Sequence, residues 1–292
     1  MISPHRDHWA EWMLHRRFGG DPEQQKTMLD LLYPVRDKVL RNAGLSEGGT
    51  LLDVGTGDGL IAFGALEQVG ERGKVIFSDI SQDLLNHSRS LAADMGVLDR
   101  CRFVLAPADD LSAIRDESVD AVTTRSVLIF VADKQRAFQE FHRVLKPGGR
   151  ISFFEPINSF GYPRPPHLFW SYDVTPVIEL ASKVRAVYDR LQPVAGSPML
   201  DFDEHDLIAF AEQTGFKEVH LQFYADVEPT RPEKWESAVR RSPNPLVPTL
   251  EEAMNQALTP EEAERFVAYL RPLVEAGKGE ARSAVAYLWA VK

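Results

Sequence analysis

Short apolar segments alternate with helix-like segments over the first half of the chain. The segments that read as strands are residues 50–54, 74–79, 101–106, 118–124 and 149–155. Each is apolar on both faces, as strands covered by helices on two sides are. Because helix-like stretches and glycine turns separate them, the pattern predicts βαβ units and a parallel sheet.

The pattern changes after residue 156. Residues 156–200 are rich in proline and aromatic residues, and residues 203–214 predict a helix. Residues 218–227 alternate between apolar and polar side chains, which predicts an edge strand or a strand with one wet face. Residues 283–291 are apolar on both faces. A last strand more apolar than the one before it predicts that the seventh strand inserts between the fifth and the sixth.

Composition narrows the class of protein. The chain has 292 residues, a net charge of -10 and one cysteine, Cys101. The acidic balance argues against a nucleic-acid partner, and the single cysteine excludes an intrachain disulfide and fits a reducing compartment. Since no apolar run reaches the roughly 18 residues of a membrane span, and the N-terminus lacks the apolar core of a signal peptide, we expect no membrane partner and a cytoplasmic protein.

The segment from Leu51 to Gly59 places a glycine turn between a buried strand and a helix. Glycines let a backbone approach a ligand closely, and a helix N-terminus offers unpaired N–H groups. Asp79 ends the next strand, where a carboxylate is placed to bind a ribose diol. The combination predicts a nucleotide-type cofactor.

The spacing of the glycines distinguishes an NAD-binding turn from the turn in this chain. NAD-binding turns usually read G-x-G-x-x-G, whereas this turn reads G-x-G-x-G, with Asp53 before it and Asp58 inside it. Two carboxylates would repel a pyrophosphate but would tolerate an ammonium and a sulfonium. An NAD(P)-dependent Rossmann reductase is therefore the disfavoured alternative, and the chain also lacks the Tyr-x-x-x-Lys pair of such enzymes.

This turn resembles motif I of the class I S-adenosylmethionine (SAM)-dependent methyltransferases, in the branch that includes the ubiquinone and menaquinone biosynthesis methylases. The likeness covers roughly residues 48–156 and includes the segment R-V-L-K-P-G-G at residues 143–149. The resemblance implies SAM as cofactor and methyl transfer, by in-line displacement, to an O, N or C nucleophile of a small-molecule substrate. A non-catalytic SAM-binding protein of the same fold is a second alternative.

The resemblance also implies which residues hold the cofactor. The methionine half is expected beside the glycine turn and the end of the fourth strand, at Asp53, Gly55, Gly57, Gly59, Arg125 and Ser126. Asp79 would bind the ribose hydroxyls and Ile80 would pack on the adenine. Ala108 and Asp109 would lie at the adenine edge, where the family often reads G-D-A-E. Because Pro107 in this chain offers no side-chain acceptor, Asp109 is expected to serve instead.

The acceptor is expected to contact aromatic residues outside the sheet. The candidates are Trp9, Trp12, Phe169, Trp170 and Tyr172. The two N-terminal tryptophans fit two interpretations equally, covering the active site or docking the first helix. A general base is needed only for a protonated acceptor, and Glu155, His167 and Tyr172 are candidates by location alone. We expect no metal, because the N-terminal histidines His5, His8 and His15 lack further ligands at matching spacing.

Together these observations predict an α/β fold, a Rossmann-like seven-stranded doubly wound sheet with an antiparallel last strand. We expect an N-terminal helical cover at residues 1–45 and a SAM-binding methyltransferase domain at residues 46–292. Lid insertions are expected at 156–200 and 230–280, because connections of that length are usually functional. The cover is expected to shield the substrate from water, and a homodimer remains open.

Overall fold

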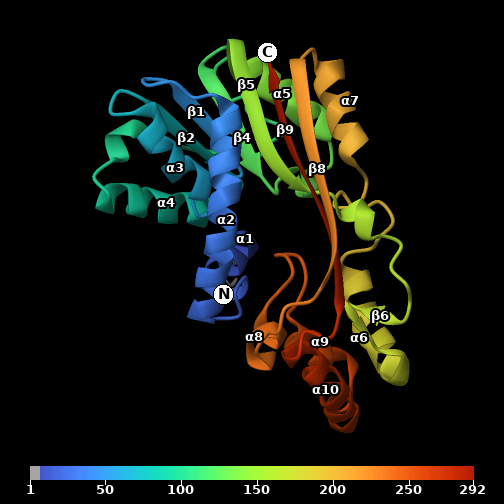
Figure 1. Cartoon of the computed structure of the whole chain (residues 1–292). Helices are drawn as coiled ribbons and strands as arrows, with labels where there is room; N and C mark the ends of the chain where they lie inside the picture. The colour runs from blue at the N-terminus through green and yellow to red at the C-terminus, as the bar shows by residue number, and fades with distance from the viewer. Residues whose placement is uncertain (1–6) are drawn as a thin grey trace, which may run out of the picture. The chain divides into compact units, whose positions relative to one another are not determined.

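The computed structural model describes residues 7–292, and within them the main sheet has seven strands. Their order is β3-β2-β1-β4-β5-β9-β8 (Figure 1). The strands are β1 (Thr50–Val54), β2 (Lys74–Asp79), β3 (Cys101–Leu105), β4 (Val119–Arg125), β5 (Leu145–Pro156), β8 (Lys217–Pro229) and β9 (Glu280–Val291). The predicted fold class is confirmed.

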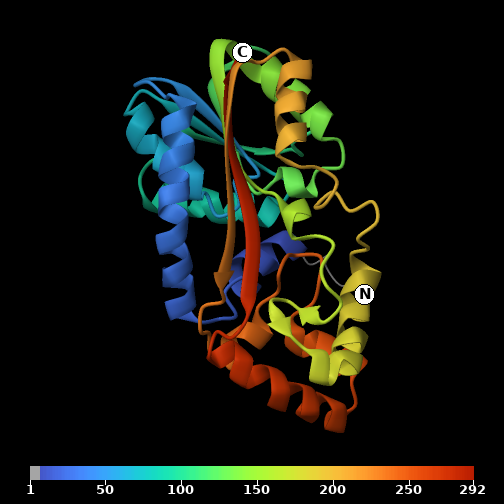
Figure 2. The same ribbon diagram turned by 45° about the vertical axis from the view of Figure 1, so that its right-hand side comes forward.

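Strand pairing confirms the predicted insertion of the last strand. β1 pairs in parallel with β2 and β4, whereas β9 pairs antiparallel with β5, with Ile151 opposite Ala290. β9 separates β5 from β8, and Figure 2 shows the two long C-terminal strands side by side. β8 is the mostly exposed edge strand that its alternating pattern predicted.

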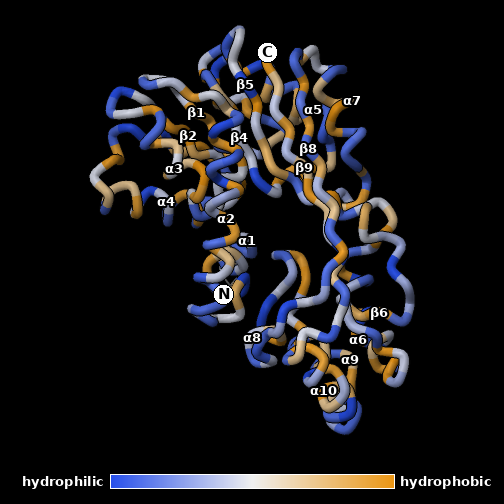
Figure 3. The backbone as a smooth tube through the Cα atoms, in the orientation of Figure 1, coloured by the Kyte–Doolittle hydropathy of each residue, from blue (hydrophilic) through white to orange (hydrophobic). Residues whose placement is uncertain are grey.

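Helices cover both faces of the sheet. They are α2 (Pro22–Ala43), α3 (Leu60–Val69), α4 (Gln82–Asp94), α5 (Lys134–Val144) and α7 (Glu204–Thr214). Successive residues of β5 show the two faces, since side chains alternate along a strand. Phe153 packs edge-on against Phe138 of α5, whereas Phe154 packs against the cluster that contains Leu40 of α2 and Ile61 of α3. Hydrophobic residues gather along the central strands (Figure 3).

The chain divides into two compact units. The sheet unit contains residues 29–157, 198–224 and 285–292, and the helical unit contains the described residues up to Met28 together with 158–197 and 225–284. The division falls within α2, and the expected helical cover at residues 1–45 stays a prediction. The later part of α2 belongs to the sheet unit because Val39, Leu40 and Ala43 are buried in its core.

The helical unit is built from short elements around its own core. They are α1 (His8–Glu11), a π-helical turn (Trp12–Arg16), the hairpin β6 (Leu168–Phe169) and β7 (Tyr172–Asp173), α6 (Ile178–Leu191), α8 (Trp235–Arg240), α9 (Leu250–Ala257) and α10 (Pro260–Glu275). α10 begins with a capping box, in which the side chain of Thr259 accepts from the N–H of Glu262. Phe266 on α10 is fully buried in this core.

One boundary differs from the sequence prediction. The sequence predicted a strand that begins at residue 149, but α5 ends at Val144 and β5 begins at Leu145. Leu145 is fully buried and pairs with Val119, and the register shifts before the next pair. Burying Leu145 in the sheet therefore ends the helix early and leaves the K-P-G-G segment as an irregularity in the strand.

No helix among residues 7–292 combines the length and apolar character needed to cross a bilayer.

Candidate functional site

The glycine turn after β1 has a backbone that only glycine adopts easily. Gly55, Gly57 and Gly59 have φ angles of 63°, 57° and 82°. A Cβ atom added to Gly55 would lie 2.3 Å from Cγ2 of Val127, and one added to Gly59 would lie 2.5 Å from Cε2 of Phe63. The left-handed backbone therefore favours glycine at all three positions, and close packing requires it at Gly55 and Gly59.

The side chain of Asp53 links the glycine turn to the sheet through two hydrogen bonds. Its carboxylate is buried and accepts hydrogen bonds from Oγ1 of Thr56 and Oγ1 of Thr123, both at 2.8 Å. Burial raises the pKa of Asp53 to about 7, and the threonine hydroxyls act in the opposite direction. Because Thr123 belongs to β4, Asp53 links the turn to the neighbouring strand, and its contact with the cofactor stays a prediction.

Asp79 ends β2 beside the glycine turn. Its Oδ2 accepts from the backbone N–H of Gly57 at 2.8 Å, and its Oδ1 accepts from the N–H of Ser81 at 2.9 Å. The carbonyl of Gly57 in turn accepts from Oγ of Ser88 on α4 at 3.3 Å. These two hydrogen bonds fix the orientation of the Asp79 carboxylate at the end of β2, beside the glycine turn.

Two apolar side chains flank this carboxylate. Ile80 is 50% exposed and Leu105, which is opposite Asp79 in the β2–β3 register, is 55% exposed. The sequence singled out Ile80 but missed Leu105, although an apolar residue ending a strand at the ligand edge was the available signal. Ala108 is buried and Asp109 is half-buried in the following loop.

The loop after β4 forms a second side of the same sheet edge. Ser126 has a φ of 57° and its N–H donates to the carbonyl of Phe154 at 2.9 Å, and Arg125 before it is half-buried. Glu155, named as a candidate base, is fully buried. Its carboxylate accepts from the N–H groups of residues 127, 128 and 129. This geometry favours holding the loop over proton transfer to a substrate.

The other predicted residues lie in the helical unit. Phe169 and Tyr172 are buried in its core, and Trp170 stacks on Phe169 with ring centroids 5.5 Å apart. His167 is exposed. Trp12 donates from Nε1 to the carbonyl of Ser242 at 2.9 Å, which favours docking of the N-terminal segment over covering a substrate. Trp9 belongs to α1, and the predicted role of these residues toward an acceptor stays a prediction. Of the three histidines weighed as metal ligands, His5 lies outside the described residues.

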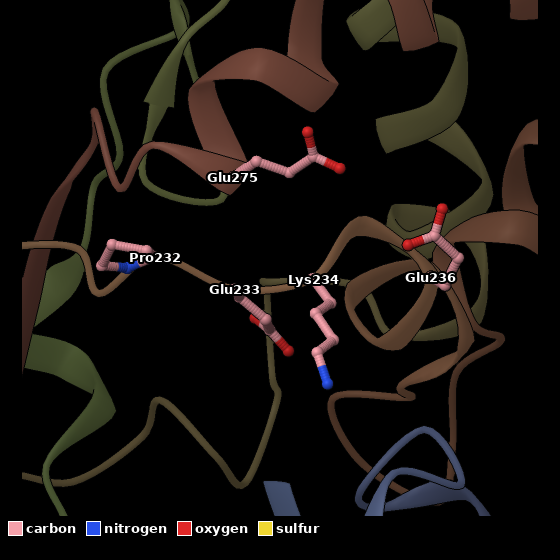
Figure 4. A pocket seen from close by; sticks show the side chains of 5 residues that line it. All are labelled: Pro232, Glu233, Lys234, Glu236 and Glu275. Atoms are coloured by element: carbon pink, nitrogen blue, oxygen red, sulfur yellow. The ribbon is translucent and has the colours of Figure 1, made fainter. Parts of the chain in front are cut away.

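The helical unit also carries a hollow, which is lined by Pro232, Glu233, Lys234, Glu236 and Glu275 (Figure 4). Its charged side chains have ion-pair partners. Arg271 contacts both Glu236 and Glu275, at 3.0 and 2.8 Å, and Lys234 contacts Glu23 at 2.6 Å. Glu233 forms an ion pair with Arg241 at 2.6 Å. The charge of this hollow is thus neutralised locally, and none of the predicted site residues lines it.

The sheet edge has the chemistry that SAM requires. Asp79 presents a carboxylate beside the glycine turn, Ile80 and Leu105 present exposed apolar surface, and the glycine turn allows a close backbone approach. The buried carboxylate of Asp53 beside the turn suits a cationic ligand better than a pyrophosphate. Together with the antiparallel β9 between β5 and β8, this site defines a class I SAM-dependent methyltransferase.

Comparison with known proteins identifies the family. The model of the ubiE/COQ5 methyltransferase family matches residues 30–226. The ubiquinone/menaquinone biosynthesis C-methyltransferase UbiE of Escherichia coli O139:H28 is 34% identical over 184 residues, which are 61% of this chain and 70% of that protein. The chain belongs to the ubiE/COQ5 methyltransferase family.

Solved structures share the fold at lower identity. Phosphoethanolamine N-methyltransferase 2 of Haemonchus contortus, in complex with S-adenosylhomocysteine, aligns with a TM-score of 0.51 at 16% identity, over 97% of this chain and 56% of that one. The cyclase SpnF aligns with a TM-score of 0.53 at 19% identity, over 96% and 87%. Since one of these proteins is named a cyclase, the fold alone does not fix the reaction, and the family match carries that assignment.

Proposed function

We propose that the edge of the sheet unit formed by the glycine turn, Asp79 and the loop after β4 binds SAM, and that the chain transfers its methyl group to carbon of a small organic acceptor. The observation that carries the proposal is Asp79, whose carboxylate is fixed by the N–H groups of Gly57 and Ser81 between two exposed apolar side chains. SAM supplies a methyl group already activated by its sulfonium.

Each residue of the edge has a separate role in this proposal. Asp79 accepts hydrogen bonds from the ribose hydroxyls, because its carboxylate ends β2 at the edge of the sheet where ligands bind in such folds. Ile80 and Leu105 pack against the adenine, and Asp109 lies at its polar edge. The methionine half lies against the glycine turn and the loop that Ser126 begins.

Carbon is proposed as the methylated atom because the relatives are named C-methyltransferases. The family match ends at residue 226, so α8, α9 and α10 of the helical unit lie outside it. For this reason we extend the type of reaction, and not the particular quinone substrates, to this chain.

Calorimetry tests the cofactor. We expect SAM and S-adenosylhomocysteine to bind and NAD not to bind. Tight binding of NAD without binding of SAM would contradict the proposal and favour the reductase alternative.

Isotope labelling tests the reaction. The chain is incubated with deuteromethyl-labelled SAM and pools of small metabolites, and products are found by mass spectrometry and assigned by NMR. Loss of an acceptor C–H signal identifies carbon methylation. SAM binding without any labelled product from any pool would favour the non-catalytic alternative.

We further propose that residues 156–200 select the acceptor. Their aromatic content supports this, and Trp170, like Tyr188, packs against the core of the helical unit while staying partly exposed. Trp170→Ala should change acceptor turnover and leave the SAM dissociation constant near its wild-type value. A joint loss of thermal stability and SAM binding, with unchanged turnover per folded molecule, would show that the segment is structural.

We also propose that the protein is cytoplasmic and has no nucleic-acid partner. Analytical sedimentation tests whether it forms a homodimer.

A further inference from the structure

A fully buried carboxylate lies beside the proposed SAM site without being part of its surface. Glu155, at the end of β5, is 0% exposed. Its Oε1 accepts from the backbone N–H of Val127 at 2.9 Å and of Leu128 at 3.1 Å, and its Oε2 accepts from the N–H of Ile129 at 3.4 Å. Three consecutive N–H groups thus converge on one side chain.

The loop that these N–H groups belong to has a backbone that needs support. Ser126 has a φ of 57°, an unfavourable conformation for a residue with a Cβ atom. Such conformations persist where the surroundings fix them, and they cluster at functional sites. Here the carbonyl of Phe154 and the carboxylate of Glu155, two adjacent groups of β5, hold the N–H groups of residues 126–129.

This loop packs directly on the glycine turn. A Cβ atom at Gly55 would lie 2.3 Å from Cγ2 and 3.3 Å from Cγ1 of Val127, so the isopropyl group of Val127 occupies the space where a side chain would otherwise lie. Val127 is also the first residue that Glu155 holds. The carboxylate, the loop and the turn therefore form one chain of contacts within the sheet unit.

We propose that Glu155 is a positioning residue for the methionine half of the cofactor site: by fixing the N–H groups of residues 127–129, it keeps Val127 against Gly55 and sets the shape of the glycine turn. This inference rests on the proposed function. It assigns to Glu155 a role in ligand binding without contact with the ligand, in place of the role of general base.

Two ligands separate this role from a general effect on stability. S-adenosylhomocysteine carries both halves of the cofactor, whereas 5′-methylthioadenosine lacks the amino-acid group. For the near-isosteric Glu155→Gln variant, we expect the dissociation constant of S-adenosylhomocysteine to rise about tenfold, because a side-chain amide keeps only one of the two oxygens that accept from residues 127–129. The constant for 5′-methylthioadenosine, measured by displacement, should change by less than about twofold, a limit set by the ordinary scatter of exposed-site substitutions.

Glu140 on α5 provides a matched control. It is also a buried glutamate, and its Oε2 accepts from the N–H of Leu111 at 2.8 Å in the loop after β3, near Ala108 and Asp109. Since both ligands contain adenosine, Glu140→Gln should weaken both by the same factor. An equal factor for both ligands in Glu155→Gln, or no change for either, would overturn the proposal.

Val127→Ala is a second variant that leaves the Glu155 carboxylate in place. It removes the side-chain contact with Gly55 and should show the same selectivity between the two ligands, so the proposal stays testable even if Glu155→Gln does not fold. If wild-type protein binds no SAM, the proposed function fails. If wild-type protein binds SAM and both variants lack selectivity, only the role of Glu155 fails.

Discussion

The replacement Asp79→Ala tests the central contact of the proposed site. In the structure this carboxylate accepts from the N–H groups of Gly57 and Ser81, and the proposal adds two ribose hydroxyls. The variant should therefore lose affinity for SAM and also lose some stability, because two backbone donors at a buried position lose their acceptor.

The size of the binding effect follows from ordinary hydrogen-bond energies. A hydrogen bond to a charged group contributes about 1.5–3 kcal/mol, and each 1.4 kcal/mol changes a dissociation constant about tenfold. Loss of one ribose contact should thus raise the SAM dissociation constant at least about tenfold, and loss of both about a hundredfold or more. Calorimetry well below the melting temperature measures this change.

Ser81→Ala separates binding from stability. Ser81 caps α4, since its Oγ accepts from the N–H of Leu84 at 3.0 Å, and removal of such a cap costs about 1 kcal/mol. This control disturbs the start of α4, next to Asp79, without removing the carboxylate of Asp79. The ribose assignment is refuted if Asp79→Ala weakens SAM no more than Ser81→Ala does, or if the dissociation constant of Asp79→Ala is unchanged.

Three further predictions concern stability. Burial raises the pKa of Asp53 and of Glu155 to about 7, so the folded state favours the protonated acids. Their contribution to stability should be present below about pH 4, the ordinary carboxyl range, and should fall as the pH rises toward 7; a melting temperature that Asp53→Asn leaves equally pH-dependent in this window would contradict it. Phe169→Ala should lower the free energy of unfolding by about 3–5 kcal/mol in a denaturant titration, because Phe169 packs edge-on against Phe266 in a buried core. Thr124→Val should raise the melting temperature, because the buried hydroxyl of Thr124 has no hydrogen-bond partner within residues 7–292, and a lower melting temperature would reveal one.

The order of the strands in the sheet was predictable because a strand that is covered on both faces has apolar residues on both faces. Residues 283–291 lack the polar positions that the preceding strand shows, and the structure has Ala286, Leu288 and Ala290 fully buried in β9. The helix caps formed by Asp133 and Asp203 also depend on local sequence, because a side chain and the N–H three residues later lie within one helical turn.

The site was predictable in part, because the positions of some of its residues follow from local sequence. Asp79 and the glycine turn are recognisable because their spacing follows from one βαβ unit. By contrast, the link between Glu155 and the loop after β4 joins residues 26–28 positions apart through tertiary pairing. No local pattern distinguishes a carboxylate that binds backbone N–H groups from one that faces a substrate, so location alone suggested a base.

The register of the K-P-G-G segment was missed because two local signals competed. The helical pattern up to Val144 and the two glycines favour a helix that ends at Gly148. The burial of Leu145 against β4 is a tertiary effect, and it starts the strand before the glycines.

The placement of β9 also constrains how the protein is assembled during synthesis. β5 ends at Pro156, and its antiparallel partner begins only at Glu280, after most of the helical unit has been translated. β8 is made earlier, yet in the sheet it neighbours β9 and not β5. One side of β5 therefore stays unpaired until β9 has been synthesised, and unpaired strand edges are templates for aggregation. The nascent protein depends on the twelve residues of β9 to close that edge.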